Sequence, residues 1–81
     1  MVQIRYAVVL VPEPDGSAVN VIVPAFPEAH TWGENVEDAL RNAREVIELC
    51  LEQRSATGEE IPAGDSSQEL ASSVSVALPA A

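Results

Sequence analysis

Residues 23–43 read VPAFPEAHTWGENVEDALRNA, and they contain the sharpest change of pattern in the chain. Pro24 and Pro27 lack the backbone N–H that a sheet needs, so they predict a rigid break between strands. Phe26 stands between them and is expected to pack under the sheet. A short strand is predicted at residues 29–32, directly before the sequence becomes helical.

The helix is the clearest element of the sequence. Asn35 is a favourable N-cap residue, and Glu37 and Asp38 place negative charge in the first turn, where the helix dipole stabilises it. Gly33 is expected to supply a backbone conformation that other residues resist. Apolar residues then recur at helical spacing to about residue 54: Val36, Ala39, Leu40, Ala43, Val46, Ile47 and Cys50.

Alternating apolar residues predict strands at residues 2–11, 17–24 and 73–78. The first strand is apolar on both faces toward its end, through Ala7, Val9 and Val11, which favours a central strand or one covered on both sides. Between the first two strands, residues 12–16 (PEPDG) predict a tight turn and hence a hairpin.

The predicted order is β-β-β-α-β, an α+β fold in a single domain over residues 1–81. A strand that follows a helix crossover usually returns parallel to an earlier strand, so we expect a small mixed sheet with one main helix on one face. A single helix cannot cover both faces of a sheet, and the other face is therefore a natural place for a partner.

Charge narrows the class of partner. The chain has 13 acidic and 4 basic residues, none of them lysine, and a net charge of −9. Phosphate backbones and anionic membranes attract Lys and Arg, so we expect no direct binding to nucleic acid or membrane. The charge favours a basic protein partner, while a surface kept acidic for solubility is the alternative. A lone cysteine, Cys50, and an N-terminus without a signal-peptide pattern indicate a cytoplasmic protein.

The sequence offers no constellation for catalysis, and no catalytic, metal-binding or cofactor-binding residue is predicted. His30 has no evident nucleophile or carboxylate partner and is interpreted as an exposed or edge-strand histidine. Cys50 lies on the apolar side of the helix and is interpreted as a core residue. Glu37 and Asp38 point about 100° apart on a helix and so do not share a site. The chain is therefore not expected to be an enzyme.

Trp32 is open to two interpretations, as a core or edge-packing residue or as an interface anchor. The predicted partner-binding residues are the acidic loop residues together with this tryptophan: Glu13, Asp15, Glu28, Trp32 and Glu34.

The string from Val23 to Ala43 resembles the HicB-like antitoxin family, also grouped as UPF0150. The matching residues are the turn prolines, the Thr-x-Gly-acid-Asn segment and the helix start: Pro24, Phe26, Pro27, Thr31, Gly33, Glu34, Asn35, Asp38, Ala39, Asn42 and Ala43. The resemblance implies a partial ribonuclease-H-like fold and a small basic RNA-cleaving partner, a HicA-type toxin. Ala25 and Glu28 depart from the family pattern. The DNA-binding domain that many relatives carry at their C-terminus is not recognised here.

Three functions follow as hypotheses. The first is neutralisation of a HicA-type toxin. The second is an orphan, homo-oligomeric module with a structural or regulatory role, since association would help a chain with so thin a core. The third and weakest is a metal-dependent hydrolase, which the near absence of carboxylates in the strands disfavours.

Overall fold

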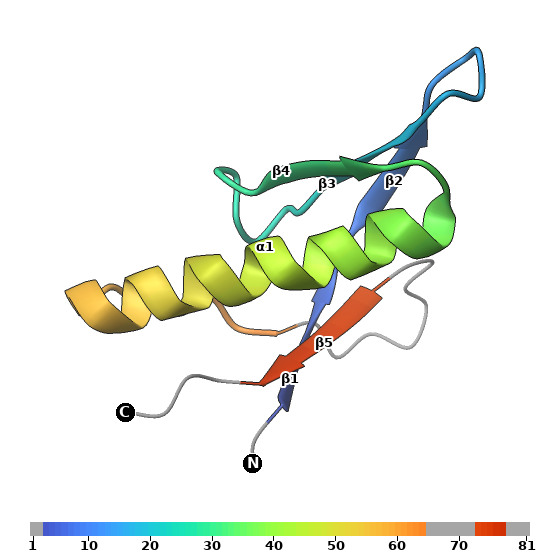
Figure 1. The fold of residues 1–81 in the computed structure, drawn as a ribbon. Coiled ribbons are helices and arrows are strands. Elements are labelled where there is room, and N and C mark those ends of the chain that lie inside the picture. The colour runs from blue at the N-terminus through green and yellow to red at the C-terminus, as the bar shows by residue number, and fades with distance from the viewer. Residues whose placement is uncertain (1–2, 65–72, 78–81) are drawn as a thin grey trace.

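The computed structural model describes residues 3–64 and 73–77 (Figure 1). Five strands and one helix follow one another along the chain: β1 (Gln3–Ala7), β2 (Val9–Pro12), β3 (Val19–Ile22), β4 (His30–Gly33), α1 (Val36–Thr57) and β5 (Ser73–Ala77). The α+β class and the predicted order of elements are confirmed. The predicted first strand is divided at Val8 into β1 and β2, because each half pairs with a different strand.

Every strand pair among the described residues is antiparallel. β2, β3 and β4 form a three-stranded sheet in that order, and β1 pairs with β5 in a two-stranded sheet. The predicted parallel return of the last strand, and with it the mixed sheet, is wrong. Residues 58–72 separate α1 from β5, and a connection of this length allows the strand to enter from either end.

The turn between β2 and β3 forms as predicted. The N–H of Gly16 donates to the carbonyl of Glu13 over 2.9 Å, and the N–H of Glu13 donates to the carbonyl of Ala18 over 2.9 Å. Gly16 has φ of 76°, a conformation that costs glycine little. Asp15 Oδ1 accepts from the N–H of Ser17 at 2.9 Å, and hydrogen bonds from Ser17 lower the pKa of Asp15. The turn is therefore fixed by its own residues.

The core lies between α1 and the strands. Phe26 is fully buried, as predicted, and its ring meets that of Tyr6 edge to face with centroids 5.0 Å apart. The Tyr6 hydroxyl donates to the carbonyl of Pro62 over 2.7 Å, which ties the chain after α1 to the core. Ala39 and Ala43 are fully buried where α1 approaches the sheet, because their small side chains allow close contact.

α1 begins and ends at well-formed caps. The side chain of Asn35 accepts from the N–H of Asp38 over 2.9 Å, as predicted for an N-cap. The helix continues beyond the predicted end to Thr57, and Gly58, with φ of 75°, closes it. Val36 was predicted to face the core but is 52% exposed. No helix in the described ranges combines the length and apolarity that crossing a membrane requires.

Two predictions about individual positions are corrected. Gly33 does not have positive φ. A Cβ there would instead collide with the backbone of Asp38 and Ala39 in the first turn of α1, so glycine is required by close packing. β2 is an edge strand of its sheet and not a central one, and Val9 and Val11 on its second face are exposed.

Candidate functional site

One face of the β2–β3–β4 sheet is turned away from the core. We call it the open face and define it by six residues in two cross-strand rows, Val9–Ile22–His30 and Val11–Asn20–Trp32. Successive side chains of a strand point to opposite sides. The intervening residues accordingly face α1, and Val19, Val21 and Gly33 among them are buried.

The open face is rich in exposed apolar side chains. Val9, Val11, Ile22 and Trp32 are each between 41% and 56% exposed. Scattered exposed apolar residues are ordinary, but several that share one sheet face indicate an interaction surface. Trp32 is therefore exposed at the surface and is not a core plug, and its role as an interface anchor stays a prediction.

Acidic residues gather at one end of the open face. Val19, the first residue of β3, lies opposite both Pro12 and Gly33. The β2–β3 turn with Glu13 and Asp15 is therefore at the same end of the sheet as the start of α1 (Figure 1). Glu34 directly follows β4 at this end. Four of the five predicted contact residues thus lie toward the same end of the sheet: Glu13, Asp15, Trp32 and Glu34.

Glu28, the fifth, lies in the β3–β4 connection at the opposite end of the sheet. Its carboxylate accepts from Nη2 of Arg54 at 2.9 and 3.2 Å. The hydrogen bond from Arg54 lowers the pKa of Glu28. The guanidinium of Arg54 also lies 4.9 Å from the centroid of the Phe26 ring. Glu28 therefore holds the β3–β4 connection to the end of α1, and the structure separates it from the other four residues.

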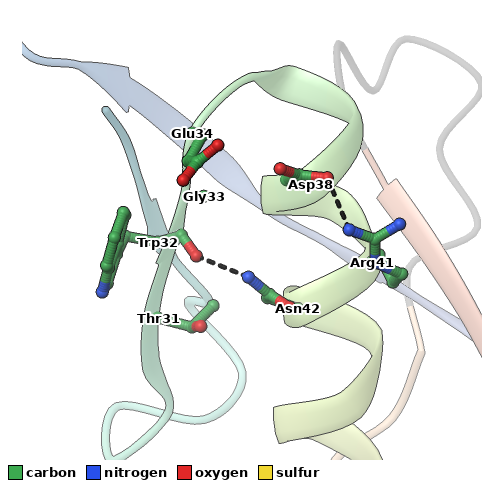
Figure 2. Close-up of a pocket in the computed structure, with 7 residues that line it drawn as sticks. All are labelled: Thr31, Trp32, Gly33, Glu34, Asp38, Arg41 and Asn42. Atoms are coloured by element: carbon green, nitrogen blue, oxygen red, sulfur yellow. Dashed lines mark hydrogen bonds and ion pairs between the residues drawn. The ribbon is translucent and has the colours of Figure 1, made fainter. Parts of the chain in front are cut away.

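A cleft of about 390 Å³ lies between β4 and the first turns of α1 (Figure 2). Asn42 Nδ2 donates to the carbonyl of Trp32 over 2.7 Å, and Arg41 pairs with Asp38 across the helix surface. The Trp32 ring points away from α1 toward the open face. Asn42 thus fixes the strand that presents this ring.

The residues considered for chemistry lie apart from one another. His30 is exposed in the Val9–Ile22–His30 row of the open face. Cys50 is buried in the core, as predicted, and burial raises the pKa of its thiol. Over residues 3–64 and 73–77, no three His, Cys, Asp or Glu side chains are grouped so that they could hold a metal ion.

The sequence interpretation missed four members of the open face: Val9, Val11, Asn20 and Ile22. The signal was present in the alternation. Once Val19 and Val21 are assigned to the core, Asn20 and Ile22 must point outward. Val9 and Val11 were recognised as apolar but were expected to be covered.

Comparison with known proteins places this fold in a family. The model of the HicB-like antitoxin of bacterial toxin–antitoxin systems matches residues 6–77. The UPF0150 protein ssr1258 of Synechocystis is 45% identical over 31 residues, which are 38% of this chain and 45% of that protein.

Two solved structures are similar over almost the whole chain. The antitoxin HicB of Burkholderia pseudomallei has a TM-score of 0.59 and 30% identity, covering 99% of this chain and 64% of that protein. The N-terminal domain of the same antitoxin has a TM-score of 0.58 and 32% identity, covering 91% of this chain and 92% of that domain. The chain thus corresponds to about two thirds of the full-length antitoxin. On these grounds, the chain belongs to the HicB-like antitoxin family.

Proposed function

We propose that this chain is a cytoplasmic antitoxin that binds a small, basic, RNA-cleaving toxin of the HicA type and neutralises it by covering its surface. It acts by binding, without catalysis and without a cofactor. The observation that carries the proposal is the open face, an exposed apolar surface with an aromatic anchor on a chain of net charge −9.

The surface has the composition that protein interfaces favour. Trp, Tyr and Arg are enriched among the hot spots near the centre of interfaces, while most other charged residues are placed at the polar rim. Val11 and Trp32 supply the apolar part, and Glu13, Asp15 and Glu34 supply negative charge at one end. A cationic partner gains faster encounter and a defined orientation from such a rim.

Growth rescue tests the proposal directly. A small, basic toxin of the HicA type is expressed from an inducible promoter, with and without this chain. Rescue of growth and co-purification of the two proteins are expected. Absence of both, with each protein folded and expressed, would refute the antitoxin role.

A matched pair of variants tests which surface is used. Ile22 on the open face is 48% exposed and Leu49 on α1 is 64% exposed. Ile22→Lys places a positive charge inside the proposed interface and is expected to raise the Kd for the toxin by 10-fold or more, since interface anchors are commonly worth about 2 kcal/mol. Leu49→Lys makes the same chemical change on α1 and is expected to leave the Kd unchanged.

The open face also supports a second candidate, an orphan module that associates with itself. Exposed valine, isoleucine and tryptophan side chains can be buried equally by a second copy. The molecular mass of the purified chain in solution, measured by light scattering with no toxin present, distinguishes the two. A stable dimer that Ile22→Lys dissociates, combined with failure to bind any basic toxin, favours the orphan module.

A further inference from the structure

Asn20 lies at the centre of one row of the open face, between Val11 on β2 and Trp32 on β4. Its side-chain Nδ2 donates a hydrogen bond of 2.6 Å to Oε1 of Glu13. Glu13 follows β2 and, by alternation, points to the same side as Val11. The Glu13 carboxylate is therefore held against the open face by a side chain from the neighbouring strand.

The Trp32 side chain flanks the same amide on its other side. Asn20 and Trp32 are directly opposite each other across β3 and β4, a relation that places Cβ atoms about 4.5–5.5 Å apart. The indole is 56% exposed, and it points away from α1 (Figure 2). A fixed anionic group and an accessible aromatic surface thus flank the Asn20 amide on the open face.

This pair of groups suits one kind of side chain. A guanidinium group is planar, remains charged, stacks on an indole and donates paired hydrogen bonds to a carboxylate. An ammonium group supplies the charge but does not stack in this way. We propose that Trp32 and Glu13 form a receptor for one arginine side chain of a cationic protein partner, with Asn20 as the residue that positions the carboxylate.

Charge favours a basic protein over a second copy of this chain as the occupant. A second copy would bring a further net charge of −9 against the Glu13 carboxylate and its acidic neighbours. A basic partner instead neutralises them. The inference rests on the proposed function for the class of partner, whereas the chemistry of the receptor can be tested without any partner.

The test uses argininamide as the probe and the full chain labelled with ¹⁵N. The chain has a single tryptophan, so the indole N–H resonance reports on Trp32 alone, and the side-chain amide resonances assigned to Asn20 report on that residue. At constant ionic strength, the Trp32 indole resonance and the Asn20 amide resonances are expected to shift with argininamide concentration along the same saturable binding curve. Citrullinamide has the same shape without the charge and is expected to bind at least about fivefold more weakly, as the loss of about 1 kcal/mol implies. Lysinamide should fall between them.

Three variants assign the effect to the two groups. Glu13→Gln keeps an acceptor for Asn20 but removes the charge, and it should weaken argininamide binding by about fivefold. Trp32→Ala should weaken it by about two- to fivefold, the range for an exposed cation–π contact, as read from the Asn20 amide. Glu52→Gln removes an exposed carboxylate from α1 and serves as the matched control, with no change expected. Equal shifts from citrullinamide, or wild-type affinity in Glu13→Gln, would overturn the receptor.

The arginine receptor and the proposed antitoxin function can be refuted independently of each other. If the wild-type chain rescues growth but argininamide moves neither resonance, the antitoxin role stands and the receptor is wrong. If argininamide binds as described but no basic toxin is neutralised, the receptor stands and the proposed function is wrong.

Discussion

Gly33 is the last residue of β4, and it lies so close to the first turn of α1 that a Cβ atom does not fit. An added Cβ would collide with the backbone of Ala39 and Asp38. Gly33→Ala is therefore expected to lower the free energy of unfolding by about 1–3 kcal/mol, the usual cost of overpacking. Urea unfolding followed by the fluorescence of the single tryptophan measures it.

Gly16 supplies the matched control, because it has φ of 76° and open space around it. Asparagine tolerates this backbone conformation better than alanine does. Gly16→Asn should therefore be less destabilising than Gly16→Ala. At Gly33 asparagine should be at least as destabilising as alanine, since both add a Cβ. If Gly33→Asn were more stable than Gly33→Ala, glycine would be required at this position for its backbone conformation, as the sequence suggested.

Some individual residues of the candidate site could be predicted from the sequence. The exposed acids could be selected from the sequence, and four of the five predicted contact residues lie toward the same end of the sheet, while their role in binding stays a prediction. Glu28 could not be separated from them, because its partner Arg54 is 26 positions away in the sequence. Which acid forms an ion pair with a basic side chain depends on tertiary contacts that a local pattern does not contain.

The apolar periodicity of the sequence predicted which helices and strands form better than it predicted which strands pair. The alternation in residues 73–78 predicted a strand, and β5 forms at Ser73–Ala77. The partner of that strand is β1, and its direction relative to β1 is antiparallel. Neither is encoded in the alternation, so the predicted parallel pairing failed. The division at Val8 was missed for the same reason, since β1 and β2 share one apolar pattern and differ only in their partners.

The β3–β4 connection is fastened to the end of α1 by the ion pair of Glu28 with Arg54, and this contact predicts a pH dependence. The hydrogen bond from Arg54 lowers the pKa of Glu28 below its ordinary value of 4.5. A carboxylate with a lowered folded-state pKa stabilises the fold above the unfolded-state pKa and ceases to do so as the pH falls through the folded-state pKa. Glu28→Gln should therefore be less stable than wild type at pH 7, with a difference that shrinks as the pH falls below about 4.5.

A double-mutant comparison isolates the pair. In an Arg54→Gln background, Glu28→Gln is expected to show a smaller pH-dependent difference, because the largest cause of the lowered Glu28 pKa is gone while the backbone hydrogen bond remains. The urea midpoint between pH 7 and pH 3 is the measurement. A difference between wild type and Glu28→Gln that persists unchanged to pH 3 would contradict the assignment.

The whole molecule divides its surface between two tasks. α1 packs against one side of the sheet (Figure 1), where the buried side chains form the core, and the residues of the open face point to the other side. A chain of 81 residues with this arrangement buries little apolar surface by itself. A bound partner would add stability by mass action, so the antitoxin should unfold at higher urea concentration in its complex than alone.

Salt distinguishes the two candidate functions. Added salt weakens the attraction of this chain to a basic toxin, but it also weakens the repulsion between two copies of the chain. A net charge of −9 attracts a basic toxin, and added salt weakens that attraction. The Kd for the toxin should rise steadily between 50 and 500 mM NaCl (roughly the range over which the Debye length falls from about 14 to 4 Å), mainly through a slower association rate. Two copies of this chain repel one another instead, so self-association should strengthen over the same range. The association rate for the toxin and the molecular mass of the free chain, measured at each salt concentration, give the salt dependence of toxin binding and of self-association. A toxin affinity that is independent of salt would show that the acidic end of the open face contributes nothing to recognition.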